Sequence, residues 1–187
     1  MTTVILILAC IVTVSSLLKV SMMSTLAQCV VAVAYGLFAW LSMGWMTEVS
    51  HDVFTQLLTA RPTRLNIGVC ITLEAMVMMA WCFRSPLTSH PSPLTSHPSP
   101  LTSHLLSFYP GLLFAAAISF VQAQMLWLLP GSDFTLLAWL SALGVMLLIM
   151  GGSRLLRWLT GSDAQRKEML FIVNLLALLL CIIITGG

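Results

Sequence analysis

The stretch LNIGVCITLEAMVMMAWCF, residues 65–83, is long and apolar enough to cross a lipid bilayer as an α-helix. It carries a single acidic side chain, Glu74, close to its centre. Comparable apolar runs fill most of the rest of the 187-residue chain. The sequence therefore predicts an all-α, polytopic transmembrane helical bundle that forms one domain over residues 1–187.

The overall composition supports this fold class. Hydrophobic residues make up 59% of the chain and charged residues 7%, whereas soluble domains contain about 25% charged residues. The eight basic residues are too few and too scattered to form a nucleic-acid-binding surface. We therefore expect the lipid bilayer and other membrane protein subunits as partners, and no nucleic acid.

Six apolar runs are predicted to span the membrane. The first run begins at Thr2 and is short, so a bundle of five spans is the alternative. Apolar residues at helical spacing within residues 47–64 are typical of a short helix that lies in the membrane interface. Pro130 and Gly131 predict a turn between the fourth and fifth runs. The six runs cover residues 2–18, 24–46, 65–83, 105–129, 134–153 and 169–184.

Basic residues predict the orientation of these spans, because cytoplasmic loops of membrane proteins are enriched in Lys and Arg. With six spans, both termini lie on the same side of the membrane, and only Arg61 and Arg64 belong to the loops of that side. We therefore expect a multi-pass protein of the inner (cytoplasmic) membrane with both termini outside, in the periplasm. The basic residues of the opposite loops are Lys19, Arg84, Arg154, Arg157, Arg166 and Lys167.

Residues 85–104 form a Pro/Ser/His tandem repeat, SPLTSHP-SPLTSHP-SPLTSH, with His90, His97 and His104 in equivalent positions. Its Pro and Ser content is typical of an extended linker. A metal or haem site is the alternative, but at about 3.1 Å per residue an extended chain holds successive histidines roughly 20 Å apart. The cysteines of the chain also lack the spacings of zinc or haem sites. We therefore interpret the repeat as a linker and predict neither cofactor nor metal.

Glu74 is the main candidate functional residue, because a charge at the centre of a bilayer costs at least ~2.5 kcal/mol. It is predicted either to bind a proton or cation, or to be a neutral packing residue or a contact for a partner subunit. Asn66 lies two turns earlier on the same helix face, whereas Gln122 and Gln124 lie on different faces of their helix. The candidate hydrogen-bond partners at membrane depth are Gln28, Tyr35, Asn66, Gln122, Gln124 and Asn174.

These features predict a non-catalytic subunit of an inner-membrane transport or ion-coupled complex, with Glu74 as its proton or cation site. One alternative is a self-sufficient small transporter that works as a homo-oligomer, and another is an accessory subunit of a haem, cobalamin or metal uptake system. A membrane-embedded enzyme is the remaining alternative. The sequence contains no phosphate-binding loop, zinc-helix motif or nucleophile elbow, so we expect no catalytic residue.

Overall fold

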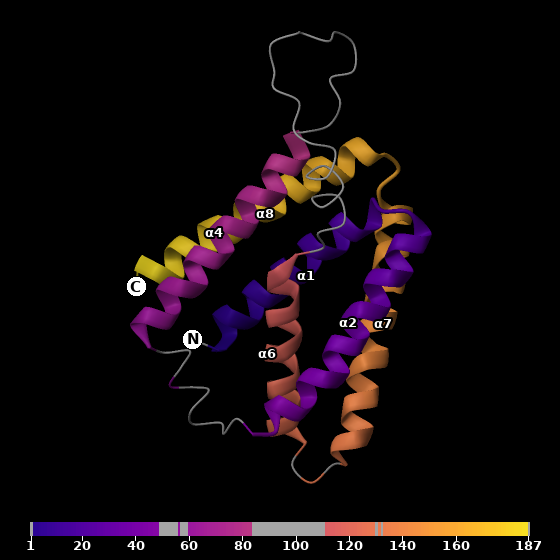
Figure 1. The fold of residues 1–187 in the computed structure, drawn as a ribbon. Coiled ribbons are helices and arrows are strands. Elements are labelled where there is room, and N and C mark those ends of the chain that lie inside the picture. Colours follow the sequence, from indigo (N-terminus) through magenta and orange to yellow (C-terminus); the bar gives the residue numbers. More distant parts are fainter. Residues whose placement is uncertain are drawn as a thin grey trace, which may run out of the picture.

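The computed structural model describes residues 2–48, 56, 60–83, 111–129, 131 and 133–186. Within these residues the chain is all-helical, which confirms the predicted helical bundle (Figure 1). The long helices correspond to the six predicted spans. Their bounds are α1 (Thr2–Ser21), α2 (Thr25–Met46), α4 (Arg61–Phe83), α6 (Leu112–Leu128), α7 (Phe134–Leu159) and α8 (Asp163–Gly186).

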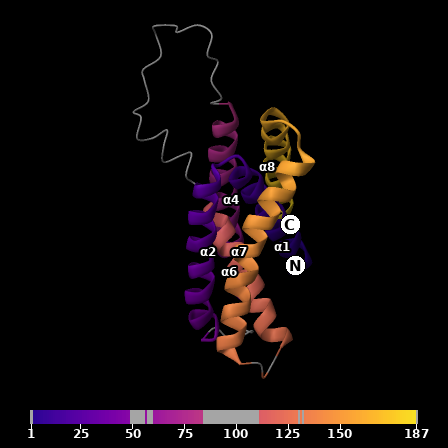
Figure 2. The same ribbon diagram turned by 90° about the vertical axis from the view of Figure 1, so that its right-hand side faces the viewer.

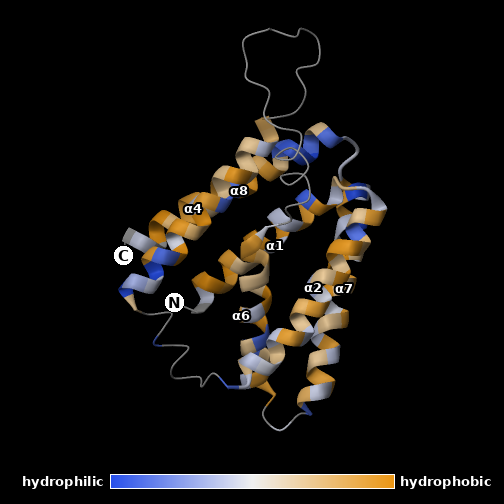
Figure 3. Cartoon of the chain, viewed as in Figure 1, coloured by the Kyte–Doolittle hydropathy of each residue, from blue (hydrophilic) through white to orange (hydrophobic). Residues whose placement is uncertain are grey.

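Four of these helices, α1, α2, α4 and α7, are long and apolar enough to cross a membrane. Helix α6 is also apolar but has only 17 residues, and α8 begins with a charged turn before it becomes apolar (Figure 3). Many large hydrophobic side chains, including Leu26, Leu147 and Ile183, are exposed to the surroundings of the bundle. An exposed apolar surface of this extent is typical of helices that face lipid.

Helix α1 lies at the centre of the bundle. Helix α2 packs along α7, and α4 packs along α8, while α1 contacts α6, α7 and α8 (Figure 1, Figure 2). One buried apolar cluster, which includes Leu17, Val31 and Ile149, joins α1 to α2, α6 and α7. A second cluster, which includes Leu8 and Ile71, joins α1 to α4 and α8. The two halves of the bundle are therefore connected mainly through α1.

Several helix boundaries differ from the prediction. The prediction ended each span at a charged residue, but a helix can continue past such a residue. Helix α1 continues past Lys19, and α7 continues through Arg154 and Arg157. Helix α8 begins at Asp163, within the segment predicted to be a polar loop, and the Ser162 hydroxyl accepts a hydrogen bond from a backbone N–H of its first turn.

The fourth predicted span is described only in part. Its described helix, α6, begins at Leu112, directly after Gly111, although the predicted run begins at residue 105. Residues 105–110 lie outside the described residues. The tandem repeat 85–104 and most of the predicted interfacial segment 47–64 also lie outside them. Those two predictions therefore stay predictions, except that residues 61–64 were wrongly placed in the interfacial segment, because they form the first turn of α4.

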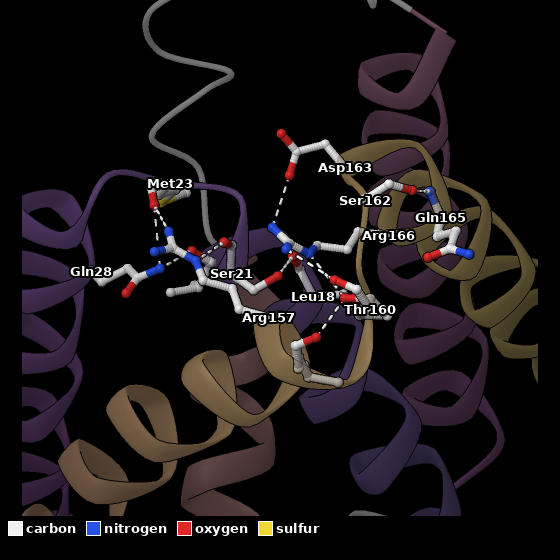
Figure 4. A network of polar contacts seen from close by, with 12 residues as sticks. Leu18, Ser21, Met23, Gln28, Arg157, Thr160, Ser162, Asp163, Gln165 and Arg166 are labelled. Carbon is white, nitrogen blue, oxygen red and sulfur yellow. Dashed lines mark hydrogen bonds and ion pairs between the residues drawn. The ribbon is translucent and has the colours of Figure 1, made fainter.

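Two interhelical turns meet at the basic end of the bundle (Figure 4). Arg157 of α7 reaches the α1–α2 turn, where its Nε donates to the Ser21 carbonyl at 2.6 Å and its Nη2 donates to the Met23 carbonyl. In the α7–α8 turn, Arg166 donates to Thr160 Oγ1 at 2.9 Å and to Asp163 Oδ1 at 2.8 Å. These contacts hold the ends of α1, α2, α7 and α8 together.

Candidate functional site

Glu74 lies at the N-terminus of α6. Its Oε2 accepts a hydrogen bond of 2.7 Å from the backbone N–H of Leu113, the second residue of that helix. The first N–H groups of an α-helix have no partner inside the helix, and the positive end of the helix dipole favours a negative charge there. The carboxylate of Glu74, on α4, is therefore stabilised by the backbone of α6, which is distant in the sequence.

The contact also fixes the depth at which α6 begins. Because Glu74 is close to the middle of α4, the start of α6 lies near the middle of α4 and not near its end. From there α6 runs toward the α6–α7 turn (Figure 1). A helix that starts inside a membrane bundle, with its N-terminus at a charged group, is a recurring element of ion and substrate sites in transporters.

Gly111 shapes this start of α6. Its φ of +113° is a backbone conformation that glycine adopts far more readily than other residues. A Cβ atom at this position would lie 2.7 Å from Glu74 Oε1 and 3.1 Å from Ser16 Oγ. From the opposite side, the hydroxyl of Tyr35 donates to the Gly111 carbonyl at 2.7 Å. Helices α2 and α4 thus position the first turn of α6 together.

On one side of Glu74 there is a groove of about 750 Å³ between α1, α4 and α6. This volume is within the range of about 300–1,000 Å³ that is usual for small-molecule sites. Its walls are mainly apolar, and they include Val12, Ile67, Ala116 and Phe120. Among the described residues that line it, the carboxylate of Glu74 and the amide of Asn66 are two of the polar groups.

On its other side, Glu74 borders a second cavity of about 10 Å³, which Ser15 and Asn174 also line. Ser15 Oγ donates to Asn174 Oδ1 at 3.2 Å, and Asn174 Nδ2 donates to the Leu170 carbonyl at 2.7 Å. A volume of about 10–15 Å³ holds roughly one water molecule when polar groups surround it. The carboxyl of Glu74 therefore lies between the groove and a cavity of the size of one water, which Ser15 and Asn174 also line.

Three of the six candidate partners lie around Glu74. Asn66 lines the groove with it, Asn174 lines the small cavity, and Tyr35 binds the carbonyl of Gly111, beside the carboxylate. Asn66 was placed on the Glu74 face by helical spacing. For Tyr35 and Asn174 the sequence shows only that a polar group at membrane depth needs a partner.

The other three candidate partners lie elsewhere. Gln28 donates to the carbonyls of Val20 and Met23 and thereby stabilises the α1–α2 turn (Figure 4). Gln122 joins α6 to α2 and α7, because its Nε2 donates to the Ala39 carbonyl at 2.6 Å and to a serine hydroxyl of α7. Gln124 is half-buried on a different face of α6 from the buried Gln122.

Lys19 is a buried cation that the sequence reading placed in a loop. Only 1% of its side-chain surface is exposed, and its Nζ lies 3.3 Å from the centroid of the Trp81 ring. The ammonium of Lys167 lies 5.8 Å from the centroid of the same ring. A lysine directly before the polar end of a span looks like a loop residue in the sequence, and only the packing of α4 against α1 reveals the aromatic partner.

We expect the contact between Lys19 and Trp81 to contribute about 0.5–2 kcal/mol to stability, as cation–π contacts do. Trp81→Leu should therefore destabilise the protein more when Lys19 is present than in a Lys19→Met background, which keeps the length of the side chain without its charge. Thermal unfolding of the two single variants and the double variant in one detergent measures this coupling. Trp158→Leu, at a tryptophan that is 82% exposed, is the control. Additive effects of the two substitutions would contradict the prediction.

Comparison of the chain with protein-family models, with curated proteins and with solved structures found no match.

Proposed function

We propose that this protein is a non-catalytic component of an ion-coupled transport complex in the inner membrane, and that Glu74 binds the coupling proton or cation. The observation that supports this proposal is the hydrogen bond between the Glu74 carboxylate and the Leu113 N–H at the start of α6. In its charged form the carboxylate is held by this N–H and by the positive end of the α6 dipole. When a proton neutralises the carboxylate, the attraction to the helix dipole is lost.

This change gives ion binding a structural consequence. Helix α6 contacts α4 only slightly but packs against α1 and α2. The bond from Leu113 to Glu74 is therefore a large part of what holds the start of α6 to α4. Neutralisation of Glu74 weakens that connection, whereas the bond from Tyr35 to Gly111 keeps α6 attached to α2. Proton uptake would then favour separation of α6 from α4 beside the groove.

Infrared difference spectroscopy of the purified protein in nanodiscs tests the titration of Glu74. We expect acidification to produce the C=O band of a protonated carboxyl group that is missing from Glu74→Gln, because an amide cannot take up this proton. Glu48→Gln, at an exposed acid outside the groove, is the matched control and should keep the band. Identical spectra of the wild type and Glu74→Gln would overturn the proposed role of Glu74.

A second candidate function is a self-sufficient homo-oligomeric transporter. It is favoured by the groove, because about 750 Å³ beside Glu74 gives a small solute room within a single chain. Purification in mild detergent separates the two functions. Retention of a different membrane protein supports the complex, whereas an isolated homo-oligomer that moves a solute across liposome membranes supports the transporter.

A further inference from the structure

We propose that Ser15, Ser16 and Lys19 of α1 carry protons between the basic end of the bundle and the carboxylate of Glu74. These three side chains are called the polar line of α1. The inference rests on the proposed proton-binding role of Glu74 and adds the route by which the proton arrives. It follows from the position of the serines beside Glu74, from the face of α1 that they share with Lys19, and from the matching face of α4.

Both serines lie next to Glu74. Ser15 lines the cavity of about 10 Å³ together with Glu74, and this cavity has room for roughly one water molecule. Ser16 meets Glu74 at the start of α6, because a Cβ atom on Gly111 would lie 2.7 Å from Glu74 Oε1 and 3.1 Å from Ser16 Oγ. A serine hydroxyl donates one hydrogen bond and accepts others, so each serine can take up a proton on one side and release one on the other.

Lys19 continues this line along α1. It follows Ser15 by four residues and Ser16 by three, so the three side chains lie on one face of the helix. One helical turn, about 5.4 Å along the axis, separates the serines from Lys19. All three side chains are buried in the bundle although each is polar. The central helix therefore places two hydroxyls and one amine in sequence between Glu74 and the basic end of the bundle.

Helix α4 follows the same line from the opposite side. Trp81 comes seven residues after Glu74, which is close to two full helical turns, so the two side chains lie on one face of α4. The Nζ of Lys19 lies 3.3 Å from the centroid of the Trp81 ring. Both ends of the polar line therefore lie between α1 and the same face of α4, with Glu74 at one end and Trp81 at the other.

Other titratable groups lie beside the two ends of the line. Cys82 of α4 interacts electrostatically with Lys19, and Lys167 of α8 interacts with Cys82. At the other end, Cys70 lines the groove beside Glu74. Cys82 and Lys167 are half-buried, so the Lys19 end of the line lies close to the surface of the bundle. Protons from the surrounding water can therefore reach Lys19 from the basic end.

The transfer conserves protons and charge. The ammonium of Lys19 gives one proton to the serine hydroxyls, and these deliver one proton to the carboxylate of Glu74, which leaves a neutral amine and a neutral carboxylic acid. Each hydroxyl loses one O–H bond and forms another. A hydronium ion at the basic end then restores the ammonium. The transfer removes two charges from the interior of the bundle, where charges are costly, whereas the Trp81 ring attracts the ammonium and so favours its return.

Lys19→Arg distinguishes a proton carrier from a fixed positive charge. Arginine keeps the charge and stacks on aromatic rings, but it does not release its proton in proteins. After a sudden drop in pH, we expect the carboxyl band of Glu74 to rise about tenfold or more slowly in Lys19→Arg than in the wild type, with a similar final amplitude. Time-resolved infrared spectroscopy in nanodiscs, with acid released from a caged proton, measures this rate. Lys167→Arg, the same exchange beside the same ring, is the control and should keep the wild-type rate.

Ser15→Ala and Ser16→Ala test the hydroxyls without changing any charge. We expect the double variant to slow the rise of the carboxyl band about tenfold or more, because it removes both hydroxyls beside Glu74. These variants also keep the inference testable if the larger side chain of Lys19→Arg does not fit its buried site.

Ser119→Ala is the matched control for the serine variants. Ser119 of α6 lines the groove, on the other side of Glu74 from the cavity that Ser15 lines, so its loss removes a hydroxyl from outside the polar line. It should leave the rate unchanged. If Ser119→Ala slows the carboxyl band and the double serine variant does not, the proton arrives through the groove and the inference fails.

The same measurements separate this inference from the function that it builds on. If the carboxyl band rises equally fast in the wild type, in Lys19→Arg and in the double serine variant, the polar line carries no protons, while the proposed role of Glu74 stands. If Lys19→Met is slow and Lys19→Arg is fast, Lys19 acts only as a fixed charge and is no carrier. If the wild type shows no such band, the proposed role of Glu74 fails, and the inference fails with it.

Discussion

Gly111→Ala is expected to lower the free energy of unfolding by about 2–3 kcal/mol and to move the carboxylate of Glu74. An alanine at φ of +113° is strained, and backbone strain of this kind costs about 1–3 kcal/mol. The new Cβ would also lie 2.7 Å from Glu74 Oε1, closer than two such atoms can approach. Either α6 or the carboxylate must therefore shift, and the bond to Leu113 is lost or lengthened.

Thermal unfolding measures the first part of this prediction, and the infrared band of protonated Glu74 measures the second. Gly131→Ala is a matched control, because Gly131 also has a positive φ of +96° but its Cβ would have no atom within 4 Å. It should show strain without any change at Glu74. If Gly111→Ala keeps both the stability and the carboxyl band of the wild type, the described geometry at the start of α6 is wrong.

Arg157→Met is expected to lower the free energy of unfolding by about 2 kcal/mol. Arg157 donates two charge-assisted hydrogen bonds to the carbonyls of Ser21 and Met23, and such bonds are worth about 1.5–3 kcal/mol each before solvent exposure reduces them. The side chain is only partly buried, and Gln28 still binds the Met23 carbonyl, so the expected loss is smaller than the sum.

Arg154→Met is the matched control for Arg157→Met. Arg154 is one turn earlier on the same helix and is exposed, so its loss removes the same charge without the carbonyl contacts. Chemical unfolding in mixed micelles compares the two variants, and hydrogen exchange of the α1–α2 turn should increase only in Arg157→Met. Equal stability of the two variants would show that Arg157 does not hold the turn.

The positions of the helices could be predicted from the sequence because the length of an apolar run is a local property. Residues 65–83 and the other runs each overlap one helix of the structure, and the turn near Gly131 separates α6 from α7 as predicted. The predicted end of α7 and the predicted start of α8 were wrong, because charged residues such as Arg154 were taken as the limits of the helices. A helix can extend beyond the hydrocarbon, where charged side chains meet water and headgroups.

The candidate site was only partly predictable. Glu74 is conspicuous in the sequence because an acid inside an apolar run is rare. Its donor, Leu113, is an ordinary apolar residue whose backbone carries the function, so no side-chain pattern indicates it. The burial of Lys19 depends on Trp81 in another helix and is equally hidden. The role of Gln28 could have been predicted from the sequence, because the Val20 carbonyl that it binds is only eight residues away.

The bond between Glu74 and Leu113 joins residues that are separated by 39 positions in the chain. During synthesis, α4 therefore leaves the ribosome before the N–H group that stabilises its acid has been made. Until then the side chain has to enter the bilayer as a neutral carboxylic acid or wait at the translocon, since a charge at the centre of an inserting helix costs about 2.5–3.5 kcal/mol. The site is therefore completed late in biogenesis, when α6 packs against α1.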